Sequence, residues 1–508
     1  MTVPVFVRRF LADYARNRVN LVLLVVVPAV FVALVAGSLA DAAQLLGGRG
    51  GTAVETATAA WAAAFLAGVG MYFQTAATRA TDQRVVVAGL RPAQLVTARL
   101  VTGLVLAGLA STVALATLAL RTGIDSPGRV VASTLMAAVI YVALGAAVGS
   151  FVPNPVNGTV VVLLVWILDV FLGPAMGARD RVGTRWLPTH FVTLWMVDLP
   201  SGHAGRLSDL GWAVLWTLSA TVVAWALVVR RTRRGAMRAR LRPGSRHGQM
   251  VAATRAAWRD TRRNPALWGL YVVVPVIFIL LADAITPQRP IAVTVRENGS
   301  RLAETYPMPE VHGATMAPIA IASLAALAGL FTVLDSRGGD RRAALAGLRP
   351  AALLTARLAV LAGVALLATA VSLAATASVF DAVHWPVYAG ANLLVALTYA
   401  LVGALLAPLF GRVGGVFMAF LLPFLDLGIA QSPMLRTTPP NWAEALPGYG
   451  AVRVLIDGAL THGFDEAGSL LLALAWLATL SILVRAAYRR TVAPSGQHAD
   501  ERPSETQL

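Results

Sequence analysis

The sequence predicts an all-α polytopic membrane protein of about twelve transmembrane helices, arranged as two parallel six-helix repeats. Of its 508 residues, 57% are hydrophobic and 13% are charged, and the mean hydropathy is +0.69. A soluble domain is usually about half apolar and a quarter charged, so this chain has too little polar surface to cover a soluble globule. The apolar residues also fall into windows of about 20 residues, the length that crosses a bilayer as a helix.

The windows expected to span the membrane form two sets of six. The first set lies near residues 19–40, 56–77, 98–120, 130–152, 157–176 and 210–229. The second set lies near residues 266–284, 315–334, 356–378, 386–408, 412–431 and 467–486. Very short turns separate the fourth and fifth windows of each set, so either pair could instead be one long or broken helix.

The formal net charge of +17 comes entirely from arginine, because the chain contains no lysine. With the N-terminus placed inside, most of the 42 arginines fall on the cytoplasmic side, and most acidic residues fall outside. The positive-inside rule then predicts that both termini lie in the cytoplasm, and we expect a multi-pass protein of a bacterial cell membrane. The basic stretch Arg230–Arg263 could be a nucleic-acid patch, but orientation and contact with anionic lipid headgroups explain it better. We therefore expect no nucleic-acid partner.

An internal repeat relates the two sets of windows. Residues 84–100 read RVVVAGLRPAQLVTARL and residues 342–358 read RAALAGLRPAALLTARL, and Asp82 and Asp340 precede the two copies at the same offset. Weaker matches join Tyr141 to Tyr399, Gly145 to Gly403, and Leu187-Pro188 to Leu446-Pro447. Because each half holds an even number of spans, both halves enter the membrane in the same direction, which makes the repeat parallel.

The repeat divides the chain into two units and a tail. Residues 1–247 form the first six-span unit with its Arg-rich linker, and residues 248–491 form the second. Residues 492–508 form a polar cytoplasmic tail that we expect to be disordered. Two parallel bundles would enclose a path between them, as in a transporter, and the alternative is a duplicated scaffold without a path.

The best-matched segment lies between the second and third spans of each half. Pro92 and Pro350 suit the first turn of a helix, where the missing N–H costs nothing. We expect a short cytoplasmic helix, a turn at Gly89 or Gly347, and a helix that runs into the next span. The alternative is an ordinary basic loop that obeys the orientation rule, but its apolar residues favour a partner surface.

With these residues in view, the chain resembles the membrane subunits of type-2 ABC exporters, which carry drugs and polysaccharides. The stretches from Asp82 to Arg99 and from Asp340 to Arg357 are similar to the coupling helices of that family. Val5–Arg18 looks like its amphipathic entry helix, and Ala252–Asn264 looks like a second copy. The Leu-Pro loops before the sixth span of each half fit the short outer helices of the family. The family's glutamate ahead of the coupling helix is an aspartate here.

The resemblance implies a separate partner and a set of contact residues. The partner is a cytoplasmic ABC ATPase, as two copies or a heterodimer, and the substrate is a hydrophobic or amphiphilic drug, antibiotic, lipid or glycan. The implied coupling residues are Asp82, Arg84, Leu90, Arg91, Pro92, Asp340, Arg342, Leu348, Arg349 and Pro350. A Walker A loop needs a lysine for the phosphates, so the sequence predicts no P-loop ATPase and no enzyme activity in this chain.

Two acidic residues fall at equivalent places within spans, Asp169 and Asp426. An ionisable residue in a span is a functional candidate, because burying an unpaired charge in lipid is costly. They could line the substrate path, or they could lie near the outer headgroups and pair locally.

Metal and cofactor chemistry is not expected. The seven histidines are scattered without ligand spacing, and there are no cysteines. A secondary transporter of the major facilitator kind is an alternative, but residues 335–340 keep only part of its loop motif. An integral membrane transferase would need an acidic or histidine cluster that the sequence does not display. In the outer segment 287–313, the alternation of Ile291–Val295 favours a strand.

Overall fold

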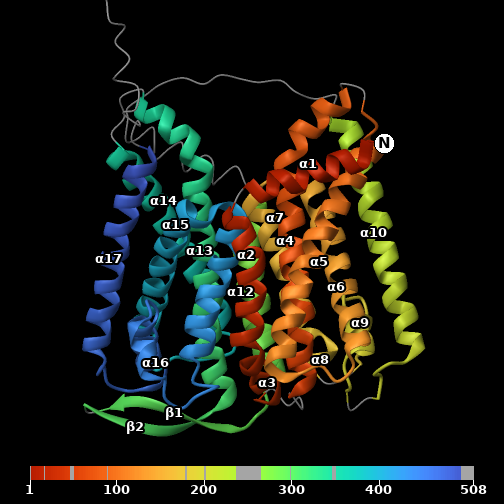
Figure 1. The fold of residues 1–508 in the computed structure, drawn as a ribbon. Coiled ribbons are helices and arrows are strands. Elements are labelled where there is room, and N and C mark those ends of the chain that lie inside the picture. Colours follow the sequence, from red (N-terminus) through yellow and green to blue (C-terminus); the bar gives the residue numbers. More distant parts are fainter. Residues whose placement is uncertain are drawn as a thin grey trace, which may run out of the picture.

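The computed structural model describes residues 2–16, 18–45, 51–87, 90–177, 180–199, 202–235, 265–297, 299–345 and 350–492. These residues form two helical bundles side by side (Figure 1). Four sequence predictions lie outside them: the second entry helix at Ala252–Asn264, the turns at Gly89 and Gly347, the residues Leu348 and Arg349, and the tail from 493 on.

The first bundle begins with a helix that lies across the ends of the others, α1 (Thr2–Arg16) (Figure 1). One continuous span follows, made of α2 (Arg18–Val30), η1 (Phe31–Val35) and α3 (Ala36–Leu45). The remaining elements are α4 (Thr52–Val87), α5 (Pro92–Thr122), α6 (Pro127–Phe151), α7 (Pro155–Leu172), α8 (Pro174–Gly177), η2 (Val182–Thr184), α9 (His190–Met196) and α10 (Leu207–Gly235).

The second bundle repeats this order with one insertion, a β-hairpin. Its elements are α12 (Pro265–Ile285), β1 (Pro290–Glu297), β2 (Ser300–Pro307), α13 (Met308–Leu345), α14 (Pro350–Thr376), α15 (Trp385–Pro423), η3 (Phe424–Ala430), η4 (Asn441–Ala445), α16 (Tyr449–Leu460) and α17 (Ala467–Val492). The helices α9 and α16 follow the two Leu-Pro pairs, so the predicted short helices before the last span of each half are confirmed.

Eleven helices in the described parts of the chain are long and apolar enough to cross a membrane. The longest, Trp385–Ala430, has 46 residues, about 69 Å of helix against a bilayer core of about 30 Å. It breaks at Gly411, whose φ of 64° and ψ of −156° are not helical. The Tyr399 hydroxyl reaches Asp426 in spite of their separation along the chain, so the chain turns back between them. The segment therefore supplies both spans that the sequence predicts near 386–408 and 412–431.

The repeat extends to the packing of the second and fourth spans of each half. A Cβ at Gly145 of α6 would collide with the carbonyl oxygen of Gly68 on α4. In the second half, a Cβ at Gly403 of α15 would collide with the carbonyl oxygen of Ala326 on α13. The glycines matched in sequence are therefore positions where two helix backbones touch.

Aromatic rings join the two halves at the seam between the bundles. Phe65 of α4 lies 4.7 Å from Phe417 and 5.7 Å from Phe420 of α15, measured between ring centroids. Trp166 of α7 lies 5.7 Å from the same Phe420. These ring contacts form one cluster around Phe65 and Phe420, so a tilt of α4 or α15 would change the seam directly.

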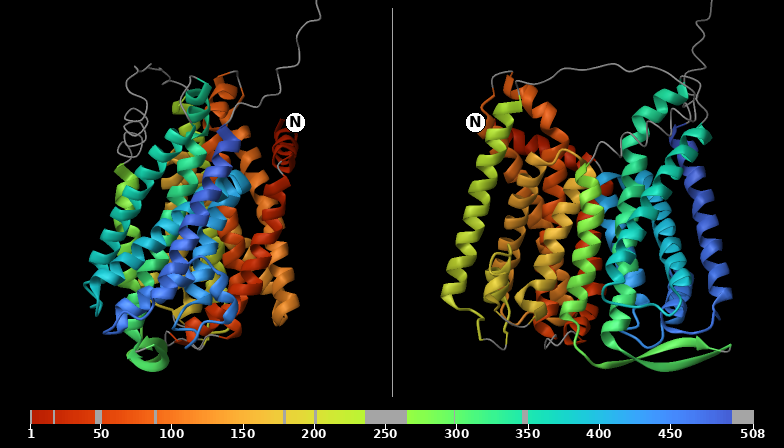
Figure 2. Two further views of the ribbon diagram at one scale, coloured as in Figure 1. Left: turned by 90° about the vertical axis from the view of Figure 1, so that its left-hand side faces the viewer. Right: turned by 180° about the vertical axis from the view of Figure 1, so that it is seen from behind.

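The hairpin covers the second bundle at the end opposite α1 (Figures 1 and 2). Its strands are antiparallel, from the pair Pro290–Pro307 to the pair Glu297–Ser300. The strand predicted at Ile291–Val295 is thus confirmed within β1. We call this end of the molecule the hairpin end and the other the α1 end.

Candidate functional site

The first matched segment lies at the α1 end (Figure 1), where the second span runs on unbroken to Val87, so the separate short cytoplasmic helix that the sequence predicts is wrong. Helix α4 runs to Val87, and Arg91 is extended, with φ of −67° and ψ of 122°, just before α5 starts at Pro92. The Leu90 N–H donates to the Val85 carbonyl oxygen at 3.2 Å. In the second half α13 ends at the same end of the molecule, and α14 begins at Pro350.

Asp82 ties the two helices of the first segment together. Its Oδ2 accepts from Arg99 Nε at 2.7 Å and from the Thr78 hydroxyl at 3.1 Å. The Arg99 guanidinium also lies 4.3 Å from the centre of the Phe10 ring, which belongs to α1. A cation over an aromatic face is attracted by the ring quadrupole, so one arginine joins the entry helix α1, α4 and α5.

Asp340 has the matching role in the second segment. It accepts from Arg357 Nη2 at 3.0 Å and from the Tyr488 hydroxyl of α17 at 2.6 Å. The residue is only 2% exposed. A buried carboxylate with two such donors is a brace inside the protein, so both aspartates hold their segments in shape from within.

The arginines of the segments differ from the aspartates in exposure. Arg84 and Arg91 are exposed in the first half, and Arg342 is exposed in the second. Leu90 and Pro92 are half-buried between them. The surface that a partner could meet at the α1 end is therefore basic, with Leu90 and Pro92 partly exposed in the first half.

Asp169 and Asp426 lie inside their own bundles. Asp169 accepts from the Tyr141 hydroxyl at 3.0 Å, from the Thr189 hydroxyl at 2.7 Å and from the Thr189 N–H at 3.2 Å. It thereby connects α6, α7 and the loop that precedes α9.

The contacts of Asp426 follow the same plan. This carboxylate accepts from the Tyr399 hydroxyl, from the Gln431 side chain and, at 2.9 Å, from the Gly448 N–H. Asp169 and Asp426 are 3% and 4% exposed. Neither is among the residues that line the cavity of ≈ 100 Å³ at the hairpin end of the seam.

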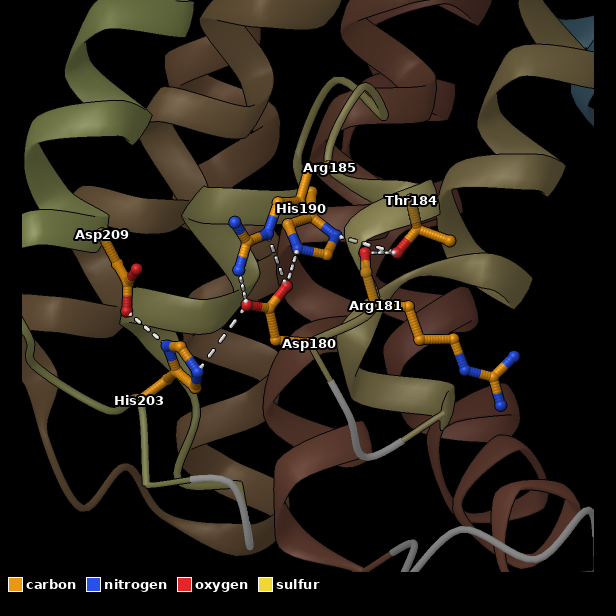
Figure 3. A network of polar contacts seen from close by, with 7 residues as sticks. All are labelled: Asp180, Arg181, Thr184, Arg185, His190, His203 and Asp209. Atoms are coloured by element: carbon orange, nitrogen blue, oxygen red, sulfur yellow. Dashed lines mark hydrogen bonds and ion pairs between the residues drawn. The ribbon is translucent and has the colours of Figure 1, made fainter.

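A second polar network holds the loops at the hairpin end of the first half (Figure 3). Asp180 accepts from Arg185 Nε at 3.1 Å, and His190 Nε2 lies 3.0 Å from the same carboxylate oxygen. His203 Nδ1 lies 2.8 Å from Asp209 on α10. His203 Nε2 is 3.9 Å from Asp180, which links the loop before α9 to the loop before α10. No group of three potential metal ligands occurs among the described residues.

The hydrogen bonds from Arg185 are the main reason that the pKa of Asp180 falls to about 2. A carboxyl whose folded pKa is depressed stabilises the protein above its unfolded pKa of about 3.9 and loses that effect as pH falls through the folded value. Asp180→Asn should therefore lower the melting temperature by a few degrees at pH 7, and the gap to wild type should close between about pH 4 and pH 2. Thermal unfolding of both proteins across this range measures it. The exposed Asp125→Asn is the control, and a gap that persists at pH 2 would show that the Asp180 ion pair is not its cause.

Comparison with known families decides the class of the first half. Residues 54–230 match the model described as ABC-2 family transporter protein. This part of the chain is similar to the ABC-2 permeases. The match runs from α4 to α10, so it contains the first coupling segment, Asp169 and the network of Asp180. Comparison with curated proteins gave no match.

The similarity to the ABC-2 permeases indicates the class of the protein. The chain is a multi-pass membrane protein with the transmembrane part of an ABC transporter, and this class is the transport component rather than an enzyme. ABC-2 permeases normally work with an ATPase subunit. The second bundle lies outside the matched residues, and its likeness to the first rests on the repeat in sequence and contacts.

Proposed function

We propose that the chain is the complete permease of an ABC exporter, with a path between its two bundles for a hydrophobic or amphiphilic substrate. The observation that carries this proposal is the pair of equivalent coupling segments at one end of a duplicated bundle. A dimer of ATPase subunits offers two docking surfaces, one on each subunit. This chain has two coupling segments, one in each half, to contact them. Both termini and both segments then face the cytoplasm of the cell, in agreement with the arginine distribution.

Long helices give the coupling segments a direct mechanical route to the seam. Helix α4 has 36 residues and α13 has 38, about 54 Å and 57 Å of continuous helix. The brace between Asp82 and Arg99 makes the end of α4 move together with α5. A push on the segment would therefore tilt α4 and displace Phe65 from Phe417 and Phe420.

The contacts of Asp169 and Asp426 support a structural role, in which each carboxylate holds an outer loop against the helices of its own bundle by hydrogen bonds. Each carboxylate is saturated with donors from its own half, so a substrate would have to break these bonds to reach it. We propose that the path runs along the aromatic seam, and that the hydrogen bonds of Asp169 and Asp426 keep its two walls rigid.

The test is transport by the purified chain in liposomes, with and without its ATPase. We expect uptake of an amphiphilic dye into inside-out vesicles only when the ATPase and ATP are both present. A proton gradient should not replace them. Transport driven by a proton gradient in the absence of any ATPase would overturn the proposal and favour a secondary transporter.

A further inference from the structure

The cavity at the hairpin end lies between the two halves. Its wall combines α3 and α7 of the first bundle with α12, α13 and η3 of the second. The rings of Phe171, Phe278 and Phe424 and the side chain of Met316 form much of this wall. The cavity has a volume of ≈ 100 Å³ and is partly open, so a ring of about the size of benzene, which fills an enclosed apolar cavity of about 150 Å³, can enter it with one end outside.

One nitrogen of His312 has no partner in this apolar wall. His312 lines the cavity and is 6% exposed. Of the described residues, only Thr286 is hydrogen-bonded to its ring, through Nδ1. No hydrogen bond to the second ring nitrogen, Nε2, occurs among the described residues, so this nitrogen is left available to a molecule in the cavity.

The contacts of Thr286 decide which chemistry that ligand needs. Its hydroxyl donates to the Ala282 carbonyl oxygen at 2.6 Å, because a carbonyl has no hydrogen to give. The same hydroxyl oxygen can then only accept from His312, so Nδ1 carries the proton. In a neutral imidazole the other nitrogen is then an acceptor. His312 Nε2 thus offers a lone pair to a hydroxyl or an N–H group.

We infer that this cavity binds the ring or short apolar end of an amphiphile that carries a hydroxyl or N–H donor, and that His312 Nε2 accepts from that donor. The inference rests on the proposed function, since it gives a substrate class to the path between the bundles. It also makes the site asymmetric: the repeat places Val54 at the position of His312 in the first half.

Phenol and toluene are matched probes, because they differ by a hydroxyl in place of a methyl group. Binding to the purified chain, without any ATPase, is measured by calorimetry for wild type and variants. We expect His312→Leu to lower the ratio of phenol to toluene affinity about fivefold to tenfold, since one hydrogen bond to a buried acceptor is lost. Toluene should still bind to this variant. The exposed His462→Leu should leave the ratio unchanged.

Two further variants keep the test sharp if His312→Leu folds poorly. Ala42→Phe fills the cavity from α3 and should abolish binding of both probes while it leaves His312 and Thr286 in place. Thr286→Val removes the acceptor that holds the proton on Nδ1, so the proton can move to Nε2. The preference for phenol should then fall, and anisole, which only accepts, should gain affinity. An equal ratio in wild type and His312→Leu, or binding that survives Ala42→Phe, would overturn the inference. Because no ATPase is present, this result is independent of whether transport needs ATP.

Discussion

Replacing both Arg84 and Arg91 with glutamate is expected to weaken association with the ATPase and ATP-driven transport strongly. The two side chains are exposed on the first coupling segment, whereas the aspartate beside them is held by Arg99. The double change reverses the charge of the surface without touching that brace, so the segment should keep its fold. Co-purification with the ATPase and dye uptake into vesicles measure the effect. We expect at least a tenfold loss of both, because opposed like charges at an interface cost several kcal/mol.

Arg489 and Arg490 provide the matched control. They lie in the last turn of α17, near the same end of the molecule, and are exposed. Glutamate at both of these positions should leave association and transport near wild type. If the control variant loses the ATPase to the same extent, general surface charge is responsible and the coupling segment has no special role.

Removing both buried carboxylates, by Asp169→Leu with Asp426→Leu, should produce the largest loss of stability. Each substitution leaves a tyrosine hydroxyl and a backbone N–H without an acceptor. Each unsatisfied buried group costs about 1–3 kcal/mol, so the double variant should give little folded protein. Fluorescence-detected size-exclusion chromatography after heating measures the remaining fraction.

The asparagine pair, Asp169→Asn with Asp426→Asn, separates the two roles of these residues. Asparagine keeps one acceptor, so this variant should fold with an intermediate melting temperature and transport in proportion to its folded fraction. The exposed Asp41→Leu serves as a control at the same end of the molecule. A variant with wild-type stability but no transport would instead place both carboxylates in the substrate path.

The sequence was most informative about features that repeat. The hydrophobic windows and the matched segments predict the spans, their order and the helix that starts at Pro92, because length and periodicity alone decide them. The pair of Tyr141 and Asp169 recurs at nearly the same offset as Tyr399 and Asp426. That coincidence was the available signal that each tyrosine meets its aspartate.

Contacts between distant segments could not be predicted in the same way. The Tyr488 hydroxyl of α17 donates to Asp340 of α13. No local sequence pattern predicts a hydrogen bond between residues so far apart along the chain. The acceptor role of His312 Nε2 depends on the hydrogen bonds of Thr286, so the positions of the histidines in the sequence do not reveal it. Asp82 and Asp340 were expected at the docking surface. Each instead forms an ion pair with an arginine of the next helix, Asp82 with Arg99 and Asp340 with Arg357.

The stoichiometry of the purified complex tests the central claim most directly. If one chain supplies the whole transmembrane path with two coupling segments, native mass spectrometry should find one copy of this chain with two ATPase subunits. Glutamate at Arg84 and Arg91 should reduce that complex to one ATPase subunit or none. A complex of two copies of this chain with two ATPase subunits would contradict the account, because each chain would then contribute only one working segment.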